Sequence, residues 1–195
     1  ALPISLRSPE WWETNAITLR TGTRVAAIDR AAHTVTTDAG EVIGYTQLAL
    51  CTGASPRHLP APVGGALGHV YQVRSLADVD AMRAEFRPGA RLVVIGGGYI
   101  GLEAAAVARK LGLTVTLVEA AARILGRVAC AETADAIRAL QCRHGVTLIE
   151  GTGLARLTGE TDVTGAELTD GRHIPADFAI VGIGVTPDTD LARAA

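Results

Sequence analysis

Several features that mark other protein classes are missing from this sequence of 195 residues. Lysine and arginine (18) nearly balance aspartate and glutamate (20), and no basic run occurs, so we expect no nucleic-acid partner. No apolar stretch approaches the length of a membrane span, and the first residues lack the pattern of a signal peptide. We therefore expect no membrane partner and a cytoplasmic location.

Closely spaced cysteines are also absent. The three cysteines, Cys51, Cys130 and Cys142, form no Cys-x-x-Cys pair. This excludes the dithiol of a flavoprotein disulfide reductase, which needs two neighbouring cysteines to relay electrons. Each cysteine is predicted to be a small buried residue of a protein in a reducing compartment. The five histidines show no metal-ligand spacing, so no metal site is expected.

The sequence does contain a pattern typical of dinucleotide binding. The segment from Arg91 to Glu103 runs from an apolar strand through a glycine-rich turn into an alanine-rich helix. In this Gly-x-Gly-x-x-Gly pattern, Gly96 permits the tight turn, Gly98 lets the backbone approach a pyrophosphate, and Gly101 lets the helix pack closely on its strand. The N-terminus of the helix would then face the phosphate anion.

An acidic residue follows at a suitable distance. Residues 113–119 read as a second buried strand that ends in Glu119. This acid lies close to the roughly 20-residue offset at which a carboxylate binds the adenosine ribose. A carboxylate there favours NAD, whereas an NADP site would place a cation there. Arg123 and Arg127 lie near enough in sequence to leave NADP open.

The remaining segments predict an α/β fold with a Rossmann-like three-layer dinucleotide-binding domain. Ser75 is the expected N-cap of a helix whose apolar face comprises Leu76, Val79, Met82 and Phe86. A turn is expected at residues 38–40, a second helix at 132–144 and a hairpin at 155–174. Strands are expected at residues 17–20, 23–28, 33–37, 41–43, 47–50, 146–149 and 178–185.

Four segments, in this order, resemble the ferredoxin reductases among the two-dinucleotide flavoproteins. They are Leu50-Cys-Thr-Gly-Ala54, the glycine-rich segment up to Glu103, the acid Glu119, and Val181-Gly-Ile-Gly-Val-Thr-Pro187. The run Val-Ile-Gly-Gly-Gly-Tyr-Ile-Gly-Leu-Glu is nearly that of the putidaredoxin reductase and biphenyl dioxygenase reductase group. The resemblance covers essentially the whole chain.

This resemblance implies an FAD domain interrupted by an NAD domain. NADH would pass hydride to FAD, and the flavin would pass single electrons to an iron-sulfur ferredoxin that serves a P450 or a ring-hydroxylating dioxygenase. Glu119 would bind the adenosine ribose, and Arg123 or Arg127 would lie near the adenosine or phosphates. The residues implied for the NAD pyrophosphate are Gly96, Gly97, Gly98, Tyr99, Ile100 and Gly101.

The same resemblance assigns the nicotinamide and flavin sides. Glu103 and Gly184 would border the nicotinamide, where a carboxylate could orient the carboxamide or stabilise developing positive charge. Glu103 could instead only favour the helix dipole. The residues implied for the FAD side are Thr52, Gly53, Arg74 and the backbone of Val25. Arg74 could also be an ordinary surface or ion-pairing residue.

The chain departs from the family pattern in several places. Cys51 and Thr46 replace a usual alanine and aspartate, and neither the first glycine-rich FAD motif nor the later Gly-Asp motif is present. We therefore interpret residues 1–75 as a partial FAD-binding domain and residues 76–195 as the NAD-binding domain. Two alternatives remain open: a non-catalytic NAD-binding module, and a related rubredoxin reductase, nitrite reductase or apoptosis-inducing-factor-like flavoprotein.

Overall fold

The computed structural model describes residues 7–195, which form two compact units. The larger unit spans Ala54–Pro187 and contains the glycine-rich turn. The smaller unit comprises residues 7–53 together with Asp188–Ala195. The assignment of residues 1–75 to a flavin domain and 76–195 to an NAD domain stays a prediction.

The larger unit is built on a five-stranded parallel sheet, which confirms the predicted α/β fold. Helix α3 (Tyr99–Lys110) joins β6 to β7, and helix α4 (Ala131–Arg143) joins β7 to β8. The strand order reverses beside β6, the position at which open α/β sheets bind ligands. In spatial order the strands are β5 (Val70–Tyr71), β12 (Phe178–Val181), β6 (Arg91–Ile95), β7 (Thr114–Glu119) and β8 (Thr147–Glu150).

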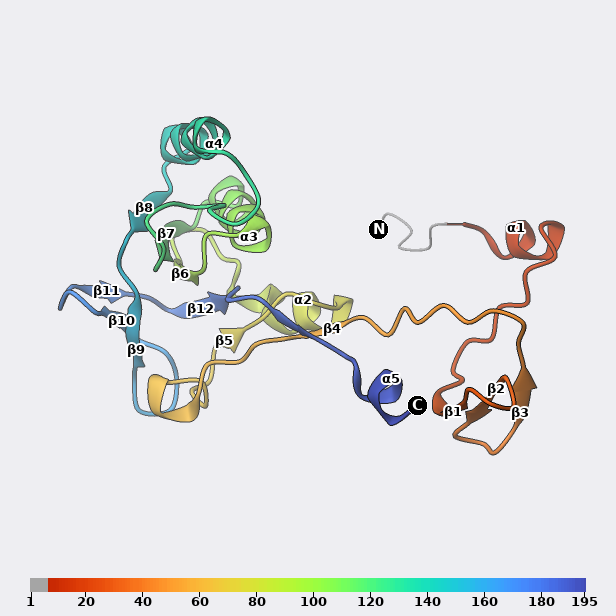
Figure 1. The fold of residues 1–195 in the computed structure, drawn as a ribbon. Helices are drawn as coiled ribbons and strands as arrows, with labels where there is room; N and C mark the ends of the chain where they lie inside the picture. Colours follow the sequence, from red (N-terminus) through yellow and green to blue (C-terminus); the bar gives the residue numbers. More distant parts are fainter. Residues whose placement is uncertain (1–6) are drawn as a thin grey trace. The chain divides into compact units, whose positions relative to one another are not determined.

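Two cores make this unit three layers thick. Alternate residues of each strand point to opposite faces, so Leu92 and Val94 pack under the helices while Val93 and Ile95 pack on the other side. That second face is covered by an antiparallel sheet of β9 (Leu154–Thr158), β10 (Gly165–Leu168) and β11 (His173–Pro175), as Figure 1 shows. Both faces of the parallel sheet are therefore buried, as its nearly continuous apolar strands require.

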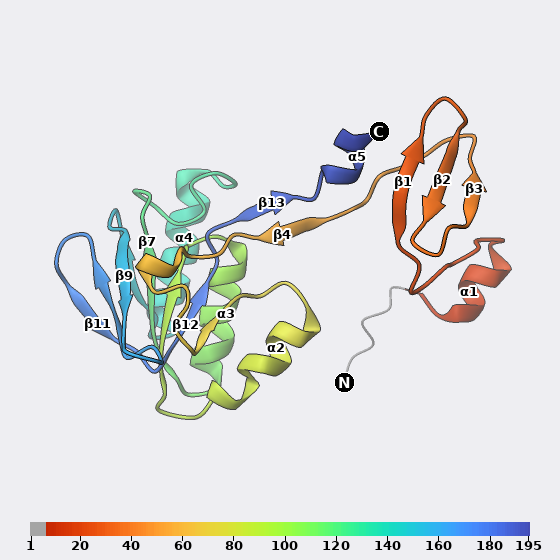
Figure 2. The same cartoon turned by 90° about the horizontal axis from the view of Figure 1, so that it is seen from below.

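The smaller unit contains a three-stranded antiparallel sheet and two short helices (Figure 2). The expected turn at residues 38–40 is confirmed, with the Gly40 amide donating to the Thr37 carbonyl. Val35 is the one apolar side chain in the described part of this unit that is buried. The elements are α1 (Pro9–Thr14), β1 (Val25–Asp29), β2 (Thr34–Thr37), β3 (Val42–Gly44) and α5 (Asp190–Ala194).

Two expected strands in this unit are wrong. Residues 17–20 and 47–50 are exposed and form no strand. Their apolar residues favour extended backbone, but a strand needs a paired neighbour, and the described chain supplies none at either place.

The helix predicted after Ser75 is confirmed as α2 (Leu76–Met82), which continues into the short 3₁₀ helix η2 (Arg83–Glu85). A capping box begins α2, because Ser75 Oγ accepts from the Asp78 amide and the Asp78 carboxylate accepts from the Ser75 amide. Its expected apolar face is only partly correct. Met82 is buried, whereas Leu76 and Val79 are 57% and 44% exposed.

The last predicted strand and the buried cysteines also need correction. The strand expected at 178–185 ends at Val181, and the chain resumes as β13 (Val185–Pro187), antiparallel to β4 (Ala54–Pro56). All three cysteines are free and exposed, against the expectation of burial. The usual burial of cysteine is a tendency of the residue type, whereas the local helix or loop decides which way each side chain faces.

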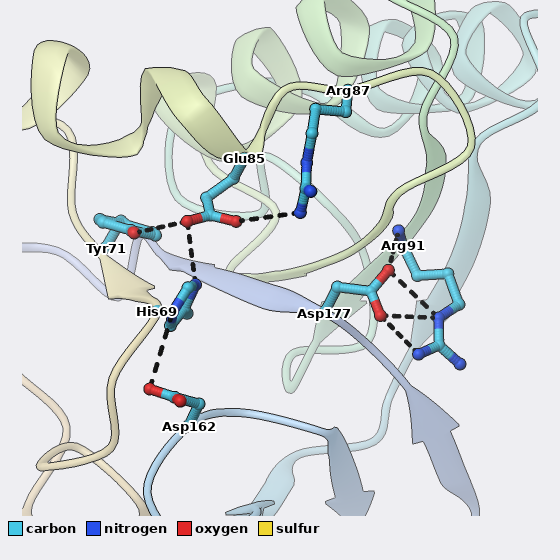
Figure 3. A network of polar contacts seen from close by, with 7 residues as sticks. All are labelled: His69, Tyr71, Glu85, Arg87, Arg91, Asp162 and Asp177. Carbon is cyan, nitrogen blue, oxygen red and sulfur yellow. Dashed lines mark hydrogen bonds and ion pairs between the residues drawn. The ribbon is translucent and has the colours of Figure 1, made fainter.

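Polar contacts join elements at the amino ends of the parallel strands (Figure 3). His69, just before β5, contacts the buried Glu85 at 2.9 Å and Asp162 at 3.6 Å. At the start of β6, the backbone amide of Arg91 donates to Asp177 at 2.8 Å, and its guanidinium forks onto the same carboxylate. The hydrogen bonds from Arg91 outweigh partial burial and lower the pKa of Asp177.

Replacing Arg91 with Met is expected to destabilise the larger unit in a pH-dependent way. Because the folded-state pKa of Asp177 is lowered, its contribution is present above the unfolded pKa and lost as pH falls through the folded pKa. At pH 7 we expect a thermal midpoint lower by about 1 to 3 °C, the scale of a partly exposed ion pair in a chain of this size. Calorimetry from pH 7 down to pH 3 should show the difference from wild type shrinking. A constant difference would contradict this account.

Candidate cofactor-binding site

The glycine-rich turn lies at the carboxyl ends of β6 and β12, where the strand order reverses. Gly96 has φ 113°, and a Cβ there would lie 2.3 Å from the Gly182 carbonyl oxygen. A Cβ on Gly101 would lie 2.0 Å from the Gly96 carbonyl oxygen. The protein itself therefore requires glycine at both positions, for the turn and for the close packing of α3 on β6.

Gly98 differs from its two neighbours in the motif. Its φ of −80° suits any residue, and a Cβ there would meet nothing within 4 Å. Gly98 is the N-cap of α3, where no side chain caps the helix. The next residues, Tyr99 and Ile100, are exposed. An uncapped helix N-terminus beside open space fits a pyrophosphate, which would occupy the room that glycine leaves.

Glu119, at the end of β7, is held against this turn. Its Oε2 accepts from the Gly97 amide and its Oε1 from the Ala121 amide, each at 2.7 Å. A Cβ on Gly97 would lie 2.7 Å from Ile124 Cγ2, so glycine is needed here too. A carboxylate oxygen has two acceptor sites, so both oxygens of Glu119 can still accept from a ribose hydroxyl.

The residues predicted for the rest of the dinucleotide lie nearby. Arg127 is exposed, and its Nη2 lies 3.9 Å from the position of a Cβ on Gly184, so the structure brings these two residues together. Arg123 is instead engaged inside its own loop, where it donates to the carbonyls of Gly126 and Cys130. Glu103 lies in the first half of α3 with an exposed side chain.

The residues predicted for the flavin side are divided between the two units. In the smaller unit, Thr52 Oγ1 donates to the Asp188 carbonyl at 2.5 Å, and the Gly53 carbonyl accepts from the Asp188 amide at 3.0 Å. Val25 belongs to the same unit but pairs with Thr37. Arg74 belongs to the larger unit, where its Nε donates to the Ala54 carbonyl at 2.8 Å. Within the smaller unit the structure thus joins Thr52 and Gly53 to Asp188, whereas Val25 pairs with a different segment.

Glu150 is a polar residue of this region that the sequence analysis missed. It ends β8 in register with Glu119, and its Oε1 accepts from the Ile124 amide at 2.7 Å. Burial would raise its pKa, but the hydrogen bonds from Arg138 and the Ile124 amide lower the pKa below its usual value. The sequence signal that could have identified Glu150 was an acidic residue at the end of the strand that follows the one ending in Glu119.

Comparison with known proteins identifies the family. Residues 7–195 match the family model described as pyridine nucleotide-disulphide oxidoreductase. The chain belongs to this family. The resemblance seen in the sequence is therefore confirmed.

Within this family, the similar proteins include ferredoxin reductases. Over 188 residues the chain is 42% identical to the 5,5'-dehydrodivanillate O-demethylase ferredoxin reductase subunit of Sphingobium sp., covering 95% of this chain and 45% of that protein. It is 37% identical to the biphenyl dioxygenase system ferredoxin–NAD(+) reductase component of Paraburkholderia xenovorans, covering 99% and 47%. The chain thus spans about half the length of these curated relatives.

A solved structure gives the same picture. The covalent complex of putidaredoxin reductase and putidaredoxin matches with a TM-score of 0.85 and 38% identity, over 97% of this chain and 47% of that one. Within the described residues, no helix has the length and apolar character needed to span a bilayer. The same residues contain no cluster of three or more potential metal ligands.

Substitutions at two glycines should separate folding from binding. We expect Gly98→Val to keep a thermal midpoint within about 3 °C of wild type, since its Cβ meets no atom, yet to lower NADH affinity more than about 100-fold. Gly101→Val should instead unfold the larger unit, because its Cβ would overlap the Gly96 carbonyl. Calorimetry and NADH titration measure both effects. Wild-type affinity in folded Gly98→Val protein would contradict the assignment of the phosphate site.

Proposed function

We propose that this chain is part of an NADH-dependent flavoprotein that reduces an iron-sulfur ferredoxin. The observation that carries the proposal is the uncapped N-terminus of α3 beside open space at Gly98, with Glu119 fixed next to it. The relatives named as ferredoxin reductases of demethylase and dioxygenase systems support the same activity. When bound, NADH supplies a hydride, and FAD accepts it and passes electrons on singly.

The larger unit supplies the NAD site in this proposal. The backbone amides at the start of α3 bind the pyrophosphate, and Glu119 accepts hydrogen bonds from the adenosine ribose. The negative charge of Glu119 also repels a 2′-phosphate, so the site prefers NADH to NADPH. Arg127 lies near the adenosine or phosphates, Glu103 and Gly184 border the nicotinamide, and Glu103 orients the carboxamide there.

The smaller unit contributes to the FAD side through Val25, Thr52 and Gly53, with Arg74 added from the larger unit. This proposal keeps the division into a partial flavin domain at 1–75 and an NAD domain at 76–195. Its support is the weak core of the smaller unit. Ile17, Leu19, Leu48 and Leu50 are each more than 40% exposed, as expected of a segment that packs against further parts of a flavin domain.

The acceptor and the location complete the proposal. We infer an iron-sulfur ferredoxin as electron acceptor, by analogy with the named relatives, and a rubredoxin as the alternative. The free cysteines agree with a reducing cytoplasm. A second candidate function is an NAD-binding module without turnover. It is favoured by the larger unit, which by itself contains both the glycine-rich turn and Glu119.

The preference for NADH can be tested at Glu119. Glu119→Gln keeps an oxygen for the Gly97 or Ala121 amide but removes the charge. We expect the ratio of NADPH to NADH dissociation constants to fall about tenfold, equivalent to about 1.4 kcal/mol. Titration of both nucleotides measures the ratio, and Glu160→Gln, at an exposed position in a loop, is the matched control. An unchanged ratio would exclude Glu119 as the selecting residue.

The reductase proposal itself is tested by visible spectroscopy. FAD is added anaerobically to the purified chain and unbound FAD is removed by gel filtration; we expect flavin bands to stay with the protein and to bleach when NADH follows. Gly98→Val protein with FAD should keep its bands after NADH. A chain that binds NADH but never retains FAD would support the non-catalytic module instead.

A further inference from the structure

We propose that the ion pair of Glu150 and Arg138 is a positioning device, which holds the loop at residues 120–130 against the glycine-rich turn and so sets the affinity for the adenosine end of NADH. This inference rests on the proposed function. It concerns two residues that are not themselves placed against the dinucleotide.

The first step is how Glu150 is held. Arg138, on α4, donates from Nε to Oε2 at 2.6 Å and from Nη2 to Oε1 at 3.0 Å. Arg138 also pairs with Asp135, one turn earlier on the same helix. Such a bidentate contact fixes the orientation of the carboxylate and favours its ionised form. Glu150 is therefore anchored between the helix and the end of β8.

The second step leads from Glu150 to the cofactor site. Glu150 Oε1 accepts from the Ile124 amide at 2.7 Å, and the next amide, that of Leu125, donates to the Gly97 carbonyl at 2.9 Å. The Gly97 amide in turn donates to Glu119 at 2.7 Å. Three hydrogen bonds thus connect Glu150, through the loop and the glycine-rich turn, to Glu119, the residue proposed to bind the ribose.

The loop needs such support, because it carries backbone strain. Leu125 has φ 54°, in the left-handed region that costs a non-glycine residue energy. The side chain of Ile124 is fully buried against the turn, so the loop cannot shift without opening a cavity there. A strained backbone persists only where its surroundings fix it, and the Glu150 carboxylate supplies one of those contacts.

The positive charge of Arg138 gives this residue a second role. Arg138 contacts two acids, Glu150 and Asp135, and its guanidinium compensates the negative charge of both. The like charge of Asp135 acts to raise the pKa of Glu150, and the hydrogen bonds from Arg138 oppose this effect. Loss of Arg138 would free Glu150 from its anchor and weaken its hold on the loop.

The test compares two arginines that each fork onto a carboxylate, Arg91 at the amino ends of the parallel strands and Arg138 at their carboxyl ends. Arg138→Met removes the contact to Glu150, and Arg91→Met removes the matching contact to Asp177. We expect Arg138→Met to raise the dissociation constants of NADH and ADP-ribose equally, by about tenfold, since ADP-ribose keeps the adenosine end and lacks only the nicotinamide. The Leu125 amide should also exchange its hydrogen faster. Arg91→Met should lower thermal stability but leave both quantities at wild-type values.

Glu150→Gln provides a second variant of nearly the same shape, in case Arg138→Met does not fold. It should also weaken ADP-ribose binding and speed exchange at Leu125. Wild-type affinity and exchange in both variants, or an equal loss in Arg91→Met, would overturn the inference. A wild-type chain that binds neither NADH nor ADP-ribose would overturn the proposed function instead, and exchange at Leu125 would still decide whether the ion pair holds the loop.

Discussion

The close approach of α3 to β6 is the constraint on which the rest of the site depends. It is possible only because Gly101 has no side chain to strike the Gly96 carbonyl. That contact fixes the axis of the helix, and the axis fixes where its first amides point. The turn also contacts Gly182, which directly follows β12. The carboxyl ends of β6 and β12 are therefore joined at the place where the strand order reverses.

The glycines in this turn are present for different structural reasons. Gly96, Gly97 and Gly101 are required by neighbouring atoms of the protein, whereas nothing in the described residues demands glycine at position 98. Gly98 is the N-cap of α3, the position at which the proposed function places the pyrophosphate. The backbone geometry therefore separates the three glycines that the fold itself requires from Gly98, which the fold does not require.

The sequence could predict those features that depend on local spacing. The turn, Glu119 at the end of β7, and Ser75 as the cap of α2 each follow from residues a few positions apart. Features that depend on tertiary packing were beyond it. The contact of Arg138 with Glu150 exists because α4 crosses back over β8, and the exposure of Cys130 follows from its place at the start of that helix.

The pairing of β4 with β13 has a consequence for the history of the molecule. The chain enters the larger unit along Ala54–Pro56 and leaves it along Val185–Pro187, and these segments are hydrogen-bonded neighbours. A folded body whose two ends meet can be inserted into a loop of another protein without stretching either one. The larger unit could therefore be inserted into different proteins by gene fusion, and its sheet and glycine-rich turn would stay intact.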